Sequence, residues 1–336
     1  MTGSTRVDAE LVRRGLARSR RHAAELVGSG RVLVAGRVVI KPSSAVTDGT
    51  DVSLLPGHDP EHDFASRAAL KLAGALDALA RVPGGPRVEG AFCADLGAST
   101  GGFTDVLLRR GAAHVVAVDV GHDQLRPALR TDDRVTVVEG FNVRDLTRAD
   151  LARAPDLVVA DLSFISLTVV LPAVAGVLRP GAHALLMIKP QFEVGRDRLG
   201  SGGVVRDPAL HAEVVRTVAH AAQDAGLQVR AVVPSPLPGP SGNREFFLWL
   251  APEDGGGPTG GSTEELGAEL VTEPVEAPRE HELADAVEVA VAWLPAQGEP
   301  AERPGHPPEP PAVVVRGRPG AAQRTQQTDE HKEHEL

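Results

Sequence analysis

The chain has 336 residues, of which 42% are hydrophobic, so it is long enough for one large and one small domain, and wholesale disorder is excluded. Its single cysteine, Cys93, excludes an internal disulfide and a four-cysteine zinc site. The net charge of −10 is unevenly distributed along the chain. Residues 1–42 carry nine basic and three acidic side chains, whereas residues 252–336 carry six basic and eighteen acidic ones. A basic segment of this kind can meet phosphate groups even in an acidic protein.

Residues 1–58 are predicted to form a compact α+β module. Apolar residues recur at helical spacing between residues 7 and 27, and short alternating segments follow at 31–34, 37–40 and 51–55. This pattern predicts two helices and a small sheet. Arginines crowd the two helices and their connection, so several guanidinium groups should share one face. That face is either a phosphate-binding surface or a solvated basic face without a partner.

The same stretch resembles an S4-type RNA-binding domain. The resemblance runs through Arg6-Val7-Asp8, Gly15-Leu16-Ala17, Ser19-Arg20, Ala24-Glu25-Leu26-Val27, Gly30-Arg31-Val32 and Lys41-Pro42-Ser43. No aromatic residue precedes Phe64, so we expect recognition through the shape and phosphates of folded RNA rather than through base stacking. The candidate RNA contacts are Arg6, Arg13, Arg14, Arg18, Arg20, Arg21, Lys41 and Arg67.

Residues 59–67 are expected to be a linker, and residues 68–251 a large α/β domain. Short apolar segments alternate there with helical patterns, which is typical of a doubly wound sheet with helices on both faces. The apolar run at 162–178 is predicted to be a buried crossover helix rather than a membrane span, because polar residues and Pro172 interrupt it. Seven strands are expected near 91–95, 114–119, 135–139, 157–160, 182–188, 229–233 and 245–250, the last two forming an edge hairpin.

The C-terminal part changes in composition. Residues 252–278 are rich in Gly, Pro, Thr and Glu, and residues 295–336 in Pro, Glu, Arg and His, so both segments are predicted to be disordered. Between them, residues 279–294 have helical apolar spacing and could dock back on the domain as a terminal helix. The acidic tail either solubilises the protein or competes with RNA for the basic module.

A glycine-rich loop at residues 95–104 follows the first strand of the large domain. Its glycines let the backbone approach a bound nucleotide closely, and Asp95 can accept hydrogen bonds from polar ligand groups. Asp119 ends the next strand, where a carboxylate can bind the ribose hydroxyls of an adenosine cofactor. Dinucleotide enzymes place an acid similarly, but this loop lacks the G-x-G-x-x-G spacing, which favours S-adenosylmethionine. The candidate cofactor contacts are Asp95, Gly97, Ser99, Thr100, Gly101, Gly102, Phe103, Asp119, Asn142 and Asp161.

Four residues are candidates for catalysis. Asp161, Lys189 and Glu245 lie at ends of predicted strands, and the carboxyl edge of a parallel sheet should bring Asp161 and Lys189 together beside the cofactor. Lys71 lies on a helix predicted over residues 68–80. Only four of the 35 basic residues are lysines, and a lysine, unlike an arginine, can lose its proton in a protein. For each residue taken singly, an ordinary ion pair is the alternative.

Lys71, Asp161, Lys189 and Glu245 resemble the K-D-K-E tetrad of FtsJ-type ribose 2'-O-methyltransferases, and residues 6–250 as a whole resemble the TlyA family. The resemblance implies a Rossmann-like, seven-stranded methyltransferase domain behind the S4 module. In one departure, Ser66-Arg67-Ala68-Ala69 stands where the family usually reads Ser-Arg-Gly-Gly, and the alanines could stiffen the hinge before Lys71. The supporting segments are residues 95–103, 159–166, 189–194, 202–205 and 235–243.

The family resemblance implies S-adenosylmethionine-dependent 2'-O-methylation of cytidine in ribosomal RNA, in 16S RNA, 23S RNA or both, with ribosomal subunits as partners. Lys189 is expected to be the general base, Asp161 to orient Lys189 and the methionine end of the cofactor, and Glu245 to position Lys71 or the ribose; no metal is required. Residues 1–30 are charged throughout, unlike a signal peptide, so a cytoplasmic protein is expected. A membrane-active hemolysin, suggested by another name of the family, and a non-catalytic RNA-binding ribosome-assembly protein remain as rivals, and the oligomeric state stays open.

Overall fold

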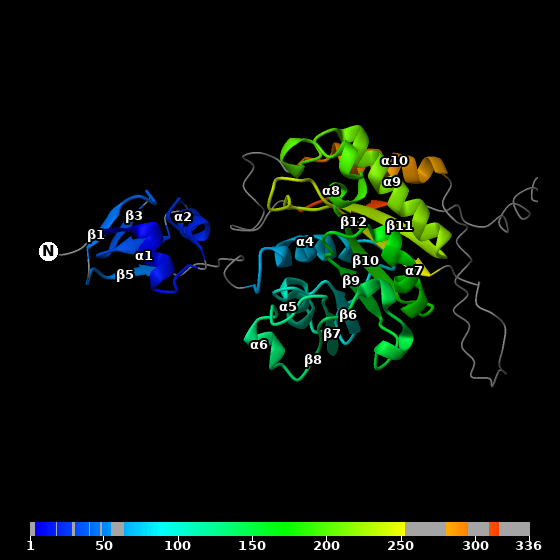
Figure 1. Ribbon diagram of the computed structural model, residues 1–336, viewed down its shortest axis with the longest axis horizontal. Helices are drawn as coiled ribbons and strands as arrows, with labels where there is room; N and C mark the ends of the chain where they lie inside the picture. Colours follow the sequence, from blue (N-terminus) through cyan, green and yellow to red (C-terminus); the bar gives the residue numbers. More distant parts are fainter. Residues whose placement is uncertain are drawn as a thin grey trace, which may run out of the picture. The chain divides into compact units, whose positions relative to one another are not determined.

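The computed structural model describes residues 4–17, 19–28, 31–39, 41–47, 49–54, 64–252, 280–294 and 309–315. It divides into two compact units, Met1–Asp63 and Phe64–Leu336 (Figure 1). The boundary falls inside the expected linker, of which residues 59–63 lie outside the described residues. Also outside them lie Arg18, residues 253–278 of the expected insertion, and most of the expected tail.

The N-terminal unit is a small α+β module. Helices α1 (Val7–Arg13) and α2 (Arg20–Gly28) pack against each other. Strands β2 (Val32–Val34), β3 (Arg37–Val39) and β5 (Val52–Leu54) form one antiparallel sheet in the order β3-β2-β5. Strand β1 (Ser4–Arg6) pairs antiparallel with β4 (Ala45–Thr47). The sequence did not predict this pair, because three-residue strands leave hardly any periodic pattern. One core joins these elements through Val7, Leu11, Ala17, Ala23, Leu26, Val27, Val32, Val46 and Val52.

The larger unit is built on one eight-stranded sheet in the order β13-β11-β12-β10-β9-β6-β7-β8. Strands β8, β7, β6, β9 and β10 run parallel, whereas β12, β11 and β13 complete the sheet with antiparallel pairs. The Rossmann-like fold expected from the sequence is confirmed, and β13 is an addition to the seven expected strands. The strands are β6 (Phe92–Leu96), β7 (His114–Val118), β8 (Val135–Val138), β9 (Leu157–Ala160), β10 (His183–Ile188), β11 (Leu227–Pro234), β12 (Phe246–Pro252) and β13 (Val313–Val314).

Helices cover both faces of this sheet, because successive strand residues point to opposite sides and both sides are apolar (Figure 1). One core contains side chains of α4, α5 and α6, and the other contains side chains of α7, α9 and α10. The apolar run at 162–178 contributes α7 as a buried crossover helix, as predicted. The helices are α4 (Ala68–Ala80), α5 (Gly102–Arg109), α6 (Pro127–Arg130), α7 (Leu167–Val177), α8 (Pro190–Glu193), α9 (Pro208–Asp224) and α10 (Glu280–Ala292).

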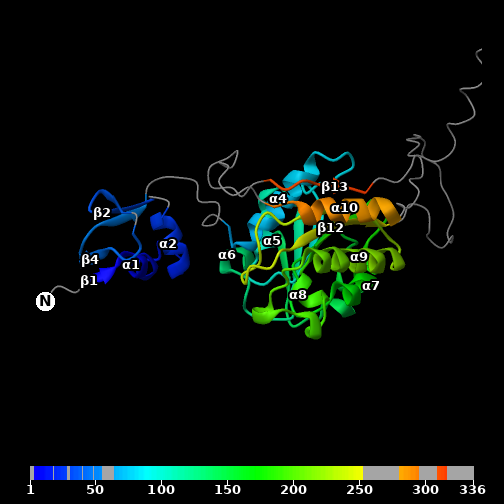
Figure 2. The ribbon, with the colours of Figure 1, turned by 90° about the horizontal axis from the view of Figure 1, so that it is seen from above.

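Two C-terminal segments pack onto the same domain (Figure 2). Helix α10, the expected terminal helix, packs against α9 and β11. Strand β13 pairs antiparallel with the edge of β11, Val313 opposite Val232 and Val314 opposite Ala231. This strand lies within the tail whose composition predicted disorder. The difference has a local cause, since the apolar run 312–315 interrupts the polar composition and supplies β-branched residues to an open sheet edge.

The chain order of the strands decides where a ligand can bind. After β6 the chain builds β7 and β8 on one side, and then crosses back to β9 on the other side of β6. A sheet of this type opens a crevice at the carboxyl ends of its strands, at the point where the order reverses. Strand β12 runs antiparallel to β10 with Phe246 opposite Ile188, so its first residues lie at the same edge.

Candidate active site

The carboxyl ends of β9 and β10 bring together Asp161 and Lys189. These strands are hydrogen-bonded neighbours, with Ala160 opposite Leu186, so the residues that follow them emerge side by side. Lys189 Nζ lies 2.6 Å from Asp161 Oδ1, and it also donates to Ser163 Oγ at 3.0 Å. Both charged side chains are largely buried, at 11% and 16% exposed. This first ion pair fixes the position of the Lys189 amine at the carboxyl edge of the sheet.

Lys71 and Glu245 form a second ion pair at the same edge. Lys71 Nζ donates to Glu245 Oε2 at 2.5 Å, and the two side chains are 7% and 1% exposed. Helix α4 provides the lysine, and the segment entering β12 provides the carboxylate. Gly74, one turn beyond Lys71, lets the loop before Glu245 approach α4, since a Cβ there would lie 2.8 Å from Pro236 Cγ. Among the described residues, Glu245 Oε1 has no hydrogen-bond partner.

The four candidate catalytic residues therefore form two buried ion pairs along one edge of the sheet. Ile188 lies opposite Phe246, which puts Lys189 and Glu245 at the next register position of adjacent strands. A buried ion pair costs desolvation of both charges, which mutual attraction offsets only in good geometry. Two such pairs at one edge of the sheet are therefore costly as purely structural features. They place two amines and two carboxyl groups where they could take part in chemistry.

Asp95 is the penultimate residue of β6 and has no exposed surface. Its Oδ2 accepts a hydrogen bond from Thr104 Oγ1 at 2.6 Å, and Oδ1 has no partner among the described residues. Burial raises the pKa of Asp95 to about 7, and the nearby carboxylates of Asp161 and Asp119 add to the increase. A buried oxygen without a partner at this edge suits a ligand that donates a hydrogen bond.

The loop between β6 and α5 needs glycine at two positions. Gly97 has φ +82°, and a Cβ there would lie 3.1 Å from the carbonyl oxygen of Asp161. Gly101 has φ +94°, and a Cβ there would lie 2.3 Å from Leu129 Cδ1. Both conformations strain any side chain. The loop thus lies close to the end of β9 on one side and to α6 on the other.

Asp119 shapes the same loop from the end of β7. Its Oδ2 accepts a hydrogen bond from Ser99 N at 2.8 Å, and its Oδ1 accepts one from Gly121 N at 2.7 Å. Each carboxylate oxygen has a second lone pair, so Asp119 can still accept from ligand hydroxyls. Phe141 N donates to the Asp119 carbonyl at 3.0 Å, which brings Asn142 beside the end of β7. Asn142 Oδ1 accepts from Arg144 N at 3.2 Å and caps a short 3₁₀ helix.

These features fit an adenosine-containing cofactor. The unpartnered Asp95 oxygen, the glycine loop and the Asp119 carboxylate lie at the ends of the neighbouring strands β6 and β7. Two further residues of the motif face other parts of the protein. Phe103 is 2% exposed and its ring lies 6.0 Å from that of Phe247, so it packs in the core. A Cβ on Gly102 would lie 2.2 Å from Ser66 Oγ, so Gly102 makes room for the segment entering α4.

An aromatic pair, missed in the sequence analysis, lies next to the catalytic candidates. Phe164 is 91% exposed and has φ +65°, and its ring centroid lies 5.1 Å from that of Phe192. Each phenylalanine follows a member of the first ion pair by three residues, since Phe164 follows Asp161 and Phe192 follows Lys189. This repeated spacing was visible in the sequence. Thr104, which holds Asp95, was also missed, because a threonine in a helix gives no distinctive signal.

In the N-terminal unit, two buried carboxylates gather four of the candidate RNA contacts. Asp8 binds Arg6 at 2.9 Å and Arg20 at 3.3 Å, and Glu10 binds Arg13 at 2.5 Å and Arg14 at 2.6 Å. The arginines hold the pKa of Glu10 at about 2. A guanidinium has five N–H donors, so a paired arginine keeps donors for phosphate. Of the remaining candidates, Arg21 and Lys41 are exposed, and Arg67 is half-buried at the start of α4.

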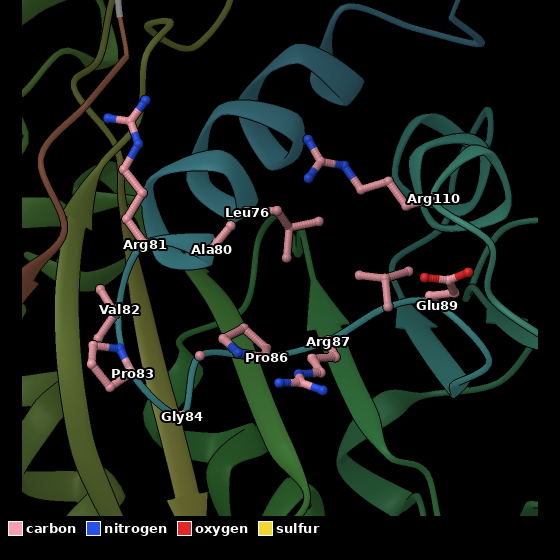
Figure 3. Close-up of a pocket in the computed structure, with 12 residues that line it drawn as sticks. Leu76, Ala80, Arg81, Val82, Pro83, Gly84, Pro86, Arg87, Glu89 and Arg110 are labelled. Carbon is pink, nitrogen blue, oxygen red and sulfur yellow. The ribbon is translucent and has the colours of Figure 1, made fainter.

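A cavity of about 960 Å³ lies away from these residues (Figure 3). The end of α4 and the segment 81–89 line it, together with Arg110. This segment leads into the amino end of β6, opposite the end that carries Asp95. None of the candidate site residues lines the cavity. Elsewhere in the described part of the chain, no group of three or more His, Cys, Asp or Glu side chains is arranged to hold a metal ion.

Comparison with known proteins defines the class of the molecule. Residues 64–251 match the family model of FtsJ-like methyltransferases, and residues 5–52 match that of the S4 domain. The protein is thus a methyltransferase with an S4 domain, and it belongs to the TlyA family of these enzymes.

Three relatives illustrate the family. The 16S/23S rRNA (cytidine-2'-O)-methyltransferase TlyA of Mycobacterium tuberculosis is 54% identical over 250 residues, which cover 74% of this chain and 91% of that protein. Hemolysin A of Brachyspira hyodysenteriae is 35% identical over 243 residues, 72% of this chain and 98% of the relative. The solved structure of a candidate hemolysin from Streptococcus thermophilus is 35% identical with a TM-score of 0.58, covering 85% of this chain and 95% of that one.

Proposed function

We propose that this enzyme transfers the methyl group of S-adenosylmethionine to the ribose 2'-oxygen of cytidine in ribosomal RNA. One observation carries the proposal: the two buried ion pairs, Lys71–Glu245 and Lys189–Asp161, lie at the carboxyl edge of the sheet beside a cofactor-type glycine loop. A relative named for this reaction is 54% identical. That relative's name supports cytidine and both rRNA molecules as targets, and a ribosomal substrate supports a cytoplasmic location.

S-adenosylmethionine supplies a methyl group activated by a sulfonium charge. Asp119 would hold the ribose hydroxyls of the adenosine, with carboxylate oxygens already oriented by Ser99 N and Gly121 N. The unpartnered Oδ1 of Asp95 and the backbone at Gly97 would contact the rest of the cofactor, and Asp161 its methionine end. Ser99, Thr100, Gly101 and Asn142 complete the proposed cofactor contacts.

Lys189 is the proposed general base. A ribose hydroxyl is a weak nucleophile, so its proton must be accepted as the oxygen forms its new bond. The lysine can accept that proton only after it has lost its own, and the ion pair with Asp161 keeps the amine at a fixed position. Glu245 holds Lys71 in the same way, and Lys71 adds a second positive charge at the edge. Arginine cannot take this role, since its guanidinium keeps its proton.

The target nucleotide must reach this edge as an unpaired residue. A base removed from its stack gains from contact with an aromatic ring, and the exposed Phe164 ring beside Phe192 offers such a surface three residues from Asp161. The arginines of α1 and α2, together with Lys41 and Arg67, would bind the surrounding RNA through phosphates. An aromatic surface for the target base and separate basic residues for phosphates together support structured RNA as the substrate rather than a free nucleotide.

Methyl transfer from radiolabelled S-adenosylmethionine to unmodified small subunits, large subunits and intact ribosomes tests the proposal. We expect the wild-type enzyme to label at least one of these substrates at a cytidine. Lys189→Arg should bind S-adenosylmethionine with unchanged affinity in calorimetry and transfer no label. Failure on all three substrates would refute the assignment, and substantial turnover by Lys189→Arg would refute the lysine base.

A second candidate function is membrane lysis, favoured by the relatives named hemolysins. In the residues that the structure describes, no helix is both long and apolar enough to cross a membrane. Release of a dye from lipid vesicles by the purified protein, without S-adenosylmethionine, would support this function. A non-catalytic ribosome-assembly protein would instead bind ribosomal subunits but neither S-adenosylmethionine nor a methyl group.

A further inference from the structure

Arg244 connects the second ion pair to the C-terminal helix. Its guanidinium donates to the carbonyl oxygen of Val291 at 2.6 Å and to that of Trp293. These carbonyls lie at the end of α10. The carbonyl groups in the last turn of a helix find no backbone N–H donor within the helix. Arg244 therefore caps α10 from outside, while its chain neighbour Glu245 binds Lys71.

Residues 244 and 245 act on opposite faces of the sheet. The Arg244 guanidinium lies 5.6 Å from the ring of Phe246, so these two side chains share the face that α10 covers. Glu245 and Phe247 lie on the other face, with α4. Consecutive residues of an extended chain alternate in this way. The dipeptide thus forms a link through the sheet, from the end of α10 to Lys71.

The loop that leads to this dipeptide is held by backbone hydrogen bonds. Gly239 N donates to Asn243 O at 2.8 Å, Gly242 N to Gly239 O at 2.9 Å, and Ser235 N to Glu245 O at 2.9 Å. Gly239 also lies close to the carboxylate, since a Cβ on it would be only 2.5 Å from Glu245 Oε1. Little room is left for the carboxylate to move on this side, so its position depends on where the chain at 243–245 is fixed.

Two anchors fix the chain there. Asn243 is buried, and it accepts from Val205 N at 2.9 Å and donates to Gly203 O at 2.9 Å. Arg244 is the second anchor, and burial lowers the pKa of its guanidinium. Helix α10 is itself firmly seated, with Leu283, Ala286, Val287, Ala290 and Val291 buried in the core. An arginine bound to a seated helix end holds its own backbone in place.

We propose that Arg244 is a positioning residue for catalysis, and that helix α10 supports the active site through it. By binding the end of α10, Arg244 sets the Glu245 carboxylate against Lys71. The C-terminal helix then belongs to the catalytic architecture although it lies on the opposite face of the sheet. The expected effect of Arg244 on turnover rests on the proposed methyl transfer, whereas its effect on how firmly the loop before Glu245 is held does not.

The test compares Arg244→Gln with Arg244→Lys and a matched control. Arg148 is the control, because it also binds a helix end, donating to Gly176 O at 2.9 Å and Leu178 O at 2.7 Å beside α7. Arg244→Gln should lower kcat at least tenfold, with the KM values for S-adenosylmethionine and rRNA unchanged. Arg244→Lys, which keeps the charge, should recover part of kcat, and Arg148→Gln should leave kcat at the wild-type value.

Hydrogen exchange of the same full-length proteins gives a readout independent of activity. In Arg244→Gln the amides of 235–246 should exchange faster, whereas Arg148→Gln should leave this segment unchanged. The proposal is overturned if Arg244→Gln keeps wild-type kcat and exchange, or if Arg148→Gln lowers kcat equally. Should Arg244→Gln not fold, Arg244→Lys decides, because a lysine lacks the guanidinium fork that reaches both carbonyls. A reduced kcat with faster exchange of 235–246 would then support the proposal, and wild-type values of both would overturn it. An inactive wild-type enzyme would refute the proposed function and leave the exchange comparison to decide the positioning role.

Discussion

Asp95 has one oxygen bound to Thr104 and the other without a partner, in a position with no exposed surface. Burial raises its pKa to about 7, whereas an aspartate in an unfolded chain titrates near 3.9. The folded state therefore binds this proton more tightly than the unfolded state does. The stability that Asp95 contributes is fully present below about pH 4 and is lost as the pH rises through about 7.

Replacing Asp95 by asparagine should remove this pH dependence. A shift of about three pKa units corresponds to a loss on the order of 4 kcal/mol between acid and alkaline pH. We therefore expect Asp95→Asn to gain stability relative to the wild type as the pH rises from 5 to 8. Urea unfolding of both proteins without cofactor measures the difference, and a difference that does not change with pH would contradict the assignment.

Phe164 can be tested without disturbing the core, because its side chain is 91% exposed. Stacking of a base on an aromatic side chain contributes about 1–3 kcal/mol. Phe164→Ala should therefore lower kcat/KM for rRNA by about 5- to 150-fold, with unchanged affinity for S-adenosylmethionine. Phe164→Tyr serves as the control and should retain activity. Steady-state kinetics with rRNA as the varied substrate would disprove the stacking role if both variants behaved alike.

Individual residues were predicted unevenly. Asp119, Asp161 and Lys189 directly follow apolar strands, and Asp95 is the penultimate residue of another. A strand end in an open parallel sheet locates such a residue in space. Gly102 and Phe103 lie in the same motif but contact Ser66 and the core. The sequence did not show these two packing contacts, because the side on which a helix begins to pack depends on residues far along the chain.

Helix α1 shows how one element combines binding with stability. Arg13 is 66% exposed, whereas Arg14 is 24% exposed and also donates to Thr50 O at 2.8 Å. We expect Arg13→Ala to weaken RNA binding and to reduce the slope of log K against log salt by about 0.9, with little change in stability. Arg14→Ala should instead destabilise the N-terminal unit. Binding titrations at several salt concentrations and thermal unfolding distinguish them, and interchangeable effects would contradict these roles.

Elements were predicted best where the pattern was long. The helix over 68–80 agrees with α4, and the terminal helix with α10, because repeated apolar spacing over three turns is hard to mistake. Strand β13 was not expected, since Val313 and Val314 acquire their structure only by pairing with β11. A two-residue strand depends on its partner's edge and not on its own sequence.

For the whole molecule, the net charge of −10 and the basic N-terminal module make opposite predictions about RNA. If the overall charge governed binding, the protein would repel RNA and added salt would strengthen the complex. If the module governs it, released counterions make binding weaker as salt increases. We expect the KM for rRNA to rise steeply between 50 and 200 mM salt, as estimated for several phosphate contacts. The affinity for S-adenosylmethionine, measured in parallel, should change little, and an rRNA KM that falls with salt would contradict the account.

The two-unit organisation was readable from composition, since a basic segment precedes an alternating α/β pattern. The link from α10 through Arg244 to Glu245 was not readable, because 46 residues separate Arg244 from Val291 and partners this distant leave no local pattern. Here the fold itself creates the connection between the C-terminal helix and the candidate active site.

The most direct measurement of the central claim is the chemical position of the transferred methyl group. Ribosomal RNA labelled by the enzyme from radioactive S-adenosylmethionine is hydrolysed in alkali, which cleaves only next to a free 2'-hydroxyl. The account predicts label in alkali-resistant dinucleotides that begin with 2'-O-methylcytidine, and none from the Lys189→Arg enzyme. Label in ordinary mononucleotides, which indicates methylation of a base, would contradict it.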